Sequence, residues 1–107
     1  MTAEERNFCL TEMSAYSDAG AYVSDLAISS VWGDTEASDI PADRIDELRR
    51  LWDAIHLPMR ELLAPLSIAE ASRRFCIPYR TVQDWFAGLH ACPAYLRLLL
   101  AESLQKL

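Results

Sequence analysis

The sequence predicts an all-α protein, a small helical bundle of about six helices that contains a helix-turn-helix. Three observations lead to this prediction. Of the 107 residues, 51% are hydrophobic and only three are glycine, a composition that favours helix and a packed core. Apolar side chains recur three and four positions apart in most segments. Thr2 and Ser67 are each followed three residues later by Glu, the pattern of a capping box at a helix N-terminus.

We divide the chain into an acidic N-terminal helical segment, 1–57, which packs on the rest, and a helix-turn-helix domain, 58–107, within one compact unit. Caps and apolar spacing predict three helices in the first segment: about Ala3 to Ala15, from a cap at Ser17 or Asp18 to about Trp32, and from Pro41 to His56. Gly33 follows the second helix as a left-handed cap. An acidic surface loop, 33–40, precedes the third helix.

The second segment predicts two short helices joined by a tight turn, over 67–88. Apolar and small residues repeat at helical spacing from Ile68 to Phe75. Pro78 ends this helix because proline disfavours helical geometry in the residue before it. The following helix spans Tyr79 to Ala87 and ends at Gly88. Prolines open a short helix before this pair and a last helix after it, at Pro58 and Pro93.

Charge is distributed unevenly along the chain. The net charge is −6, which argues against nonspecific nucleic-acid binding. Residues 1–57 hold twelve acidic and four basic side chains, a formal charge of −8, whereas 58–107 hold four acidic and six basic ones, a charge of +2. Any affinity for anions is therefore expected in the second segment.

Several function classes are not expected. There is no G-x-S-x-G motif, no phosphate-binding loop and no paired set of metal ligands, so we expect no enzyme activity, cofactor, metal or small-molecule substrate. Cys9, Cys76 and Cys92 are an odd count and are expected to be reduced thiols. No apolar run approaches the roughly 20 residues that span a bilayer, and the acidic N-terminus is unlike a secretory signal. We expect a cytoplasmic protein without a membrane partner.

The polar face of the 79–87 helix carries the candidate functional residues. With Val82 and Trp85 inward, a rotation of about 100° per residue places Arg80 and Asp84 nearly opposite them, with Gln83 and Thr81 on the shoulders. Arg pairs bidentately with guanine and Gln with adenine, while Thr bonds a phosphate or touches a thymine methyl. The candidate base-reading residues are Arg80, Thr81, Gln83 and Asp84, and the candidate phosphate contacts are Ser67, Arg73, Arg74 and Tyr79. Alternatively, Arg80 forms a surface salt bridge with Asp84, one turn later.

The stretch resembles the helix-turn-helix domains of the Cro/repressor-like (Xre-type) family. More narrowly, it is similar to small bacterial and phage proteins that carry F-G-I-P-x-R-T-[VL]-Q-x-W-x-x-G-x-R-x-P-P-x-Y. The resemblance covers Pro58 to about Leu104 and implies an all-helical DNA-binding domain whose second motif helix enters the major groove, with Arg80, Thr81 and Gln83 as its readers. The matching residues are Phe75, Ile77, Pro78, Arg80, Thr81, Val82, Gln83, Trp85, Gly88, Pro93 and Tyr95.

Two departures from this pattern bear on affinity. Cys76 stands where the family usually has Gly, and left-handed geometry costs a non-glycine residue on the order of 1 kcal/mol. The residues after Gly88, Leu89 to Cys92, lack the family's basic pair. Losing one or two cations lowers DNA affinity roughly tenfold or more at physiological salt. We therefore expect a weak or dimer-dependent reader.

Two functions fit these observations. The first is a sequence-specific DNA-binding transcriptional regulator that binds double-stranded DNA with the Tyr79 to Ala87 helix. The alternative is a helix-turn-helix scaffold repurposed for protein contacts. The last helix bears on both, because it has more apolar residues than one core stripe needs: Tyr95, Leu96, Leu98, Leu99, Leu100 and Leu104. The surplus predicts either a homodimer seam or burial under the N-terminal helices.

Overall fold

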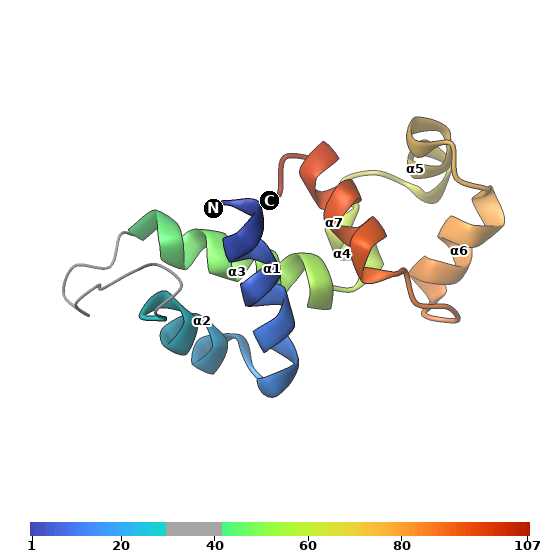
Figure 1. Cartoon of the computed structure of the whole chain (residues 1–107). Coiled ribbons are helices and arrows are strands. Elements are labelled where there is room, and N and C mark those ends of the chain that lie inside the picture. The colour runs from blue at the N-terminus through green and yellow to red at the C-terminus, as the bar shows by residue number, and fades with distance from the viewer. Residues whose placement is uncertain (30–41) are drawn as a thin grey trace. The chain divides into compact units, whose positions relative to one another are not determined.

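The computed structural model describes residues 1–29 and 42–107, and all regular secondary structure in these ranges is helical (Figure 1). The described residues form seven α-helices and one short 3-10 helix. The predicted all-α fold of about six helices is confirmed. The chain divides into two compact units, Met1–Trp52 and Asp53–Leu107, and the helix α3 (Ala42–His56) crosses their boundary. Within the described ranges, every helix is too short or too polar to cross a membrane.

The first unit begins with α1 (Ala3–Glu12), which continues into the 3-10 helix η1 (Met13–Ala15). The predicted capping box forms at its start. The Glu5 amide donates to Thr2 Oγ1 over 3.1 Å, and the Thr2 amide donates to Glu5 Oε1 over 2.7 Å. The helical segment thus extends to Ala15 as predicted, but its last three residues tighten into 3-10 geometry.

The helix α2 (Ala19–Ala27) is shorter than predicted. Its cap is Asp18, whose Oδ1 accepts the Ala21 amide at 2.9 Å. At the other end, Arg44 Nη1 donates to the Ala27 carbonyl oxygen over 3.0 Å. The Arg44 hydrogen bond satisfies this carbonyl oxygen in place of an amide of a further helical turn, and β-branched Ile28 follows. The helix therefore ends at Ala27 and not near Trp32. The predictions made for Trp32, Gly33, the 33–40 loop and Pro41 lie outside the described residues.

The core of the first unit centres on a buried tyrosine. The Tyr22 hydroxyl donates to the Cys9 carbonyl oxygen over 3.1 Å. The Tyr22 ring lies 5.2 Å from the Trp52 ring and 5.7 Å, edge to face, from the Tyr16 ring. Burial raises the pKa of the Cys9 thiol to about 11, which leaves it protonated and unreactive. The acidic segment therefore has an aromatic core of its own.

The second unit contains α4 (Met59–Leu62), α5 (Ile68–Phe75), α6 (Tyr79–Ala87) and α7 (Ala94–Ser103). Pro58 and Pro93 stand just before α4 and α7, as predicted. The helix α6 packs against α4 and α5. Apolar side chains from each helix meet in one core: Ala54, Met59, Leu62, Leu63, Ala71, Val82, Trp85, Cys92, Leu100 and Ala101.

Two cationic side chains of the second unit donate hydrogen bonds to backbone carbonyl oxygens at helix C-termini. Arg97 donates from Nε to the Ala54 carbonyl oxygen over 2.7 Å, and from Nη2 to the Leu57 carbonyl oxygen. Lys106 Nζ donates to the Leu62 and Ala64 carbonyl oxygens, each at 2.7 Å. These carbonyls lie in the last turns of α3 and α4 or just after them, where intrahelical partners are missing. Arg97 and Lys106 therefore add to the positive charge of this unit while serving its structure.

Candidate nucleic-acid interface

The helices α5 and α6 are joined by a turn of three residues, 76–78 (Figure 1). Cys76 takes the left-handed conformation, with φ 54° and ψ 40°. Its amide and that of Ile77 both donate to the Ser72 carbonyl oxygen. The Ser72 hydroxyl donates in turn to the Ile77 carbonyl oxygen over 2.6 Å. This closed set of hydrogen bonds fixes α6 relative to α5, with a non-glycine residue in the left-handed position.

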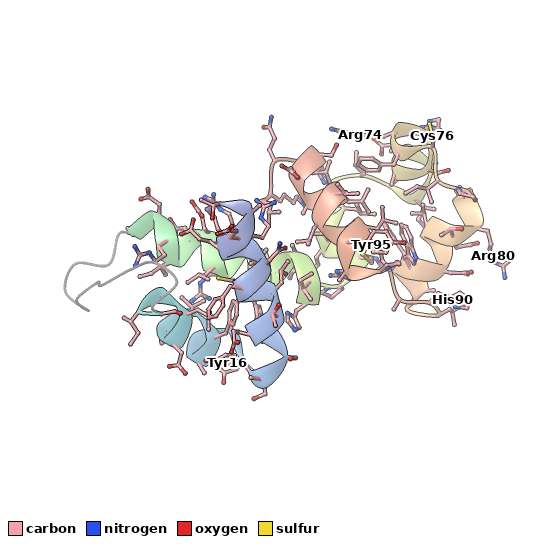
Figure 2. The ribbon with its side chains drawn as sticks, viewed as in Figure 1. Tyr16, Arg74, Cys76, Arg80, His90 and Tyr95 are labelled. Atoms are coloured by element: carbon pink, nitrogen blue, oxygen red, sulfur yellow. The ribbon has the colours of Figure 1, made fainter. Side chains whose placement is uncertain are left out.

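The inner side of α6 is sealed by apolar side chains. Val82 is fully buried and Trp85 nearly so, against Ala71 at the point where α5 approaches. The opposite side is polar, and Arg80 and Gln83 are exposed there. In Figure 2 the Arg80 side chain extends away from the helix. The predicted inward stripe is confirmed, so the polar face of α6 is available to a partner.

Thr81 is half-buried on the shoulder of α6, 200° around the helix axis from Tyr79 at about 100° per residue. Tyr79 lies on the other shoulder, and 52% of it is exposed. Of the predicted base-reading residues, Thr81 and Asp84 are thus partly withdrawn from the surface, whereas Arg80 and Gln83 are exposed. A contact of Thr81 with a partner would be at the edge of the face.

Asp84 links two other side chains at the end of α6. Its Oδ1 lies 3.2 Å from Arg80 Nε, and its Oδ2 lies 3.8 Å from His90 Nε2. The Asp84 side chain is 16% exposed, whereas that of Arg80 is 80% exposed. The salt bridge predicted as the alternative for Arg80 is therefore present. Although Arg80 is paired with Asp84, its side chain remains largely exposed to solvent.

His90 joins this cluster because of how α6 ends. Gly88 is left-handed, with φ 74°, and the Leu89 amide donates to the Asp84 carbonyl oxygen over 2.9 Å. This reversal returns the chain toward Asp84, and Figure 2 shows His90 beyond the end of α6. His90 was not among the residues predicted for this site. Its position two residues after a helix-ending glycine was the available signal.

The start of α5 is occupied by the protein's own carboxylate. The Glu70 amide donates to Ser67 Oγ over 3.1 Å, and the Ser67 amide donates to Glu70 Oε1 over 3.2 Å. Hydrogen bonding of the Glu70 carboxylate with the Ser67 side chain, and then with the Ser67 backbone, lowers the pKa of Glu70. A DNA phosphate approaching Ser67 would meet this negative charge. The predicted capping box is confirmed, and it reduces the suitability of Ser67 as a phosphate contact.

Arg73 and Arg74 are exposed in the last turn of α5. The Arg74 guanidinium carbon lies 5.6 Å from the centre of the Phe75 ring. Figure 2 shows Arg74 beside Cys76 and apart from Arg80. The structure therefore brings Arg80, Asp84 and His90 together, and it places Arg74 at a separate edge of the same two-helix unit.

The described residues contain no group of three or more His, Cys, Asp or Glu side chains arranged to hold a metal ion. Their cysteines are free thiols, and burial raises the pKa of Cys92. What the arrangement offers chemically is hydrogen bonding and charge from an exposed helix face. Scans against protein-family models, curated proteins and solved structures found no match to this chain.

Proposed function

We propose that this protein is a sequence-specific DNA-binding transcriptional regulator that inserts α6 into the major groove. The observation that carries the proposal is the two-sided character of α6. Val82 and Trp85 anchor one side in the core, and Arg80 and Gln83 stand exposed on the other. The major groove is about 12 Å wide and admits one α-helix. The tight turn at Cys76 supplies the fixed support that such a helix needs.

The side chains divide into two roles. Arg80 and Gln83 lie on the outward face and have the donor patterns that pair with guanine and adenine. Arg73, Arg74 and Tyr79 are exposed near the turn, where they are suited to contact phosphates. Phosphate contacts position the protein and base contacts select the sequence, so the two sets should respond differently to substitution.

The affinity is expected to be modest. Arg97 and Lys106 are engaged with backbone carbonyls, and Glu70 lies at the start of α5. If Arg73 and Arg74 are the two cations that neutralise phosphates, the logarithm of the binding constant should fall with the logarithm of salt concentration with a slope of about −2. A protein of this kind gains affinity by binding two half-sites as a dimer.

The test is selection from a randomised duplex pool at low salt, followed by affinity measurements over a salt series. Arg80→Ala should abolish the sequence preference at the base pair that Arg80 contacts. Arg73→Ala should weaken binding to all sequences alike and reduce the salt slope by about 1. Arg60→Ala removes an exposed cation from α4 and is the matched control. Folded protein that binds no member of the pool at low salt would refute the proposal.

A second candidate function is favoured by exposed apolar side chains near the end of the chain. Tyr95 is 70% exposed and Leu99 is 60% exposed, and their four-residue spacing places them on one side of α7. Such a surface is suited to a second copy of this chain or to another protein. We therefore also propose two alternatives: a homodimer formed through α7, or a helix-turn-helix scaffold that binds another protein.

Sedimentation of the wild type and of Leu99→Ser distinguishes these cases. A dimer that dissociates in the variant supports the α7 seam. A monomer that binds no duplex but yields a specific protein in pull-downs, with α7 protected from hydrogen exchange in the complex, supports the interaction module. A monomer that selects a duplex and retains no protein removes the basis for both α7 proposals.

A further inference from the structure

The Arg80–Asp84 pair has one constrained member and one exposed member. Only 16% of the Asp84 side chain is accessible. Its Oδ1 accepts from Arg80 Nε over 3.2 Å, and its Oδ2 lies 3.8 Å from His90 Nε2. Arg80 is 80% exposed. A carboxylate held in this way restricts where the long, otherwise freely rotating guanidinium group can lie.

The atom that Arg80 uses in this contact matters for recognition. Asp84 engages Nε, which leaves the terminal nitrogens Nη1 and Nη2 as donors. These two nitrogens are parallel donors in the planar guanidinium group. They match the two acceptors, O6 and N7, that guanine presents in the major groove. No other base presents two acceptors there side by side.

We propose that Asp84 is a positioning residue that orients Arg80 to read guanine, so that the preferred duplex carries a guanine opposite Arg80. This inference rests on the DNA-binding function proposed above. It also replaces the base-reading role expected for Asp84, whose carboxylate acts on the base through Arg80. His90 Nε2 lies 3.8 Å from the second oxygen of the same carboxylate.

The pair is not expected to act through protein stability. Exposed ion pairs one helical turn apart contribute little to folding. Its effect lies in ordering a flexible side chain before binding, which removes part of the entropy that binding would otherwise cost. Ordering one such side chain changes affinity about threefold to tenfold, and here the change applies to the guanine-containing duplex.

Neutralising Asp84 should therefore have two opposite effects. Asp84→Asn removes a negative charge near DNA phosphates, which should strengthen binding to all duplexes. The same substitution weakens the hold on Arg80, so the ratio of affinities for the guanine duplex and its adenine replacement should fall about threefold to tenfold. A carboxylate that merely repels DNA would raise every affinity and leave this ratio unchanged.

The experiment begins by selecting the preferred duplex with the full chain. Affinities are then measured for that duplex and for versions with each G·C pair replaced by A·T. The variants are Arg80→Ala, Asp84→Asn, Asp84→Glu and His90→Ala, with Glu102→Gln as a control that removes one exposed carboxylate from α7. Circular dichroism establishes that each variant is folded.

We expect Arg80→Ala to abolish the preference at one guanine and Asp84→Asn to reduce the preference at that same guanine. Asp84→Glu, which retains the carboxylate, should restore part of it, and His90→Ala should reduce it less than Asp84→Asn does. Glu102→Gln should leave the ratio unchanged.

Several results would overturn the inference. If the wild type selects a duplex and Asp84→Asn keeps the full guanine ratio, Asp84 has no positioning role and the DNA-binding function stands. If Asp84→Asn instead loses a preference for cytosine, and Arg80→Ala keeps that preference, Asp84 reads the base directly. If the folded wild type selects no duplex, the proposed function itself fails, and this inference fails with it.

Discussion

Thr2 and Ser67 begin helices in the same way in the two units. In each capping box the amide of a glutamate three residues later donates to the hydroxyl oxygen over 3.1 Å. Helix C-termini are also closed alike, by Arg44 on the Ala27 carbonyl in the first unit and by Arg97 on the Ala54 carbonyl in the second. Both units therefore satisfy the free backbone groups at their helix termini in the same two ways.

The two units differ in their exposed helix faces. The first belongs to the acidic part of the chain, and its core is built on the hydrogen-bonded Tyr22 ring. The second presents Arg80 and Gln83 on one helix, and Tyr95 and Leu99 on another. Helix caps recur wherever helices end, so they do not locate function. The difference in exposed side chains is what points to the second unit.

The largest effect on stability is expected from removing one core tryptophan from each unit. Trp85→Ala and Trp52→Ala each truncate a side chain that is less than one-tenth exposed, which costs about 3–5 kcal/mol. For Trp85→Ala we expect amides of α5, α6 and α7 to lose more protection from hydrogen exchange than those of α1 and α2. Trp52→Ala should give the reverse order. Equal loss across all helices in both variants would show that the units do not differ in local stability.

The next test removes the arginine cap of the second unit. Arg97 donates to the Ala54 and Leu57 carbonyl oxygens at the end of α3. A hydrogen bond from a charged donor contributes about 1.5–3 kcal/mol. We expect Arg97→Ala to lower the free energy of unfolding by at least this amount, measured by urea denaturation. The exposed Arg60→Ala is the control, and an Arg97→Ala effect no larger than that of the control would contradict the cap.

Local patterns predicted much of the fold and part of the candidate site. The capping boxes at Thr2 and Ser67 located the starts of α1 and α5, because a cap involves residues only three positions apart. Gly88 located the end of α6 for a similar reason. The spacing of Val82 and Trp85 then determined which side of α6 is buried and which is polar.

The parts that sequence patterns missed depend on distant partners. α2 ends at Ala27 beside an arginine 17 positions later in the chain, and the partners of Arg97 lie 40 and 43 positions away. Nothing local to Arg97 or Lys106 distinguishes a cation that caps a helix from one free to meet DNA. His90 was missed because its contact with Asp84 requires the chain reversal at Gly88.

A smaller change in stability is expected from Cys76→Gly, which tests whether the backbone of the α5–α6 turn is strained. Cys76 is left-handed, which costs a non-glycine residue about 1–2 kcal/mol. Cys76→Gly relieves this cost, but glycine makes the unfolded chain more flexible, which offsets about 0.4–1 kcal/mol. We expect a net stabilisation of about 0.5–1 kcal/mol, visible as a melting temperature higher by about 2–4 °C. Cys9→Ala, which creates a small cavity in the first unit, should lower it instead. A lower melting temperature for Cys76→Gly would show that the thiol makes contacts that outweigh the strain.

The smallest expected effect concerns the carboxylates of the two capping boxes. Hydrogen bonds from Ser67 hold the pKa of Glu70 below its ordinary value of 4.5, and those from Thr2 do the same for Glu5. Because the folded-state pKa is lowered, this stabilisation is present above pH 4.5. It is lost as the pH falls through the native pKa. Glu70→Gln and Glu5→Gln keep a hydrogen-bond acceptor but do not titrate. The stability difference between wild type and either variant should therefore be largest near neutral pH and shrink in acid. Urea denaturation across this pH range measures it, and parallel profiles for wild type and variants would show that neither charged carboxylate stabilises its helix.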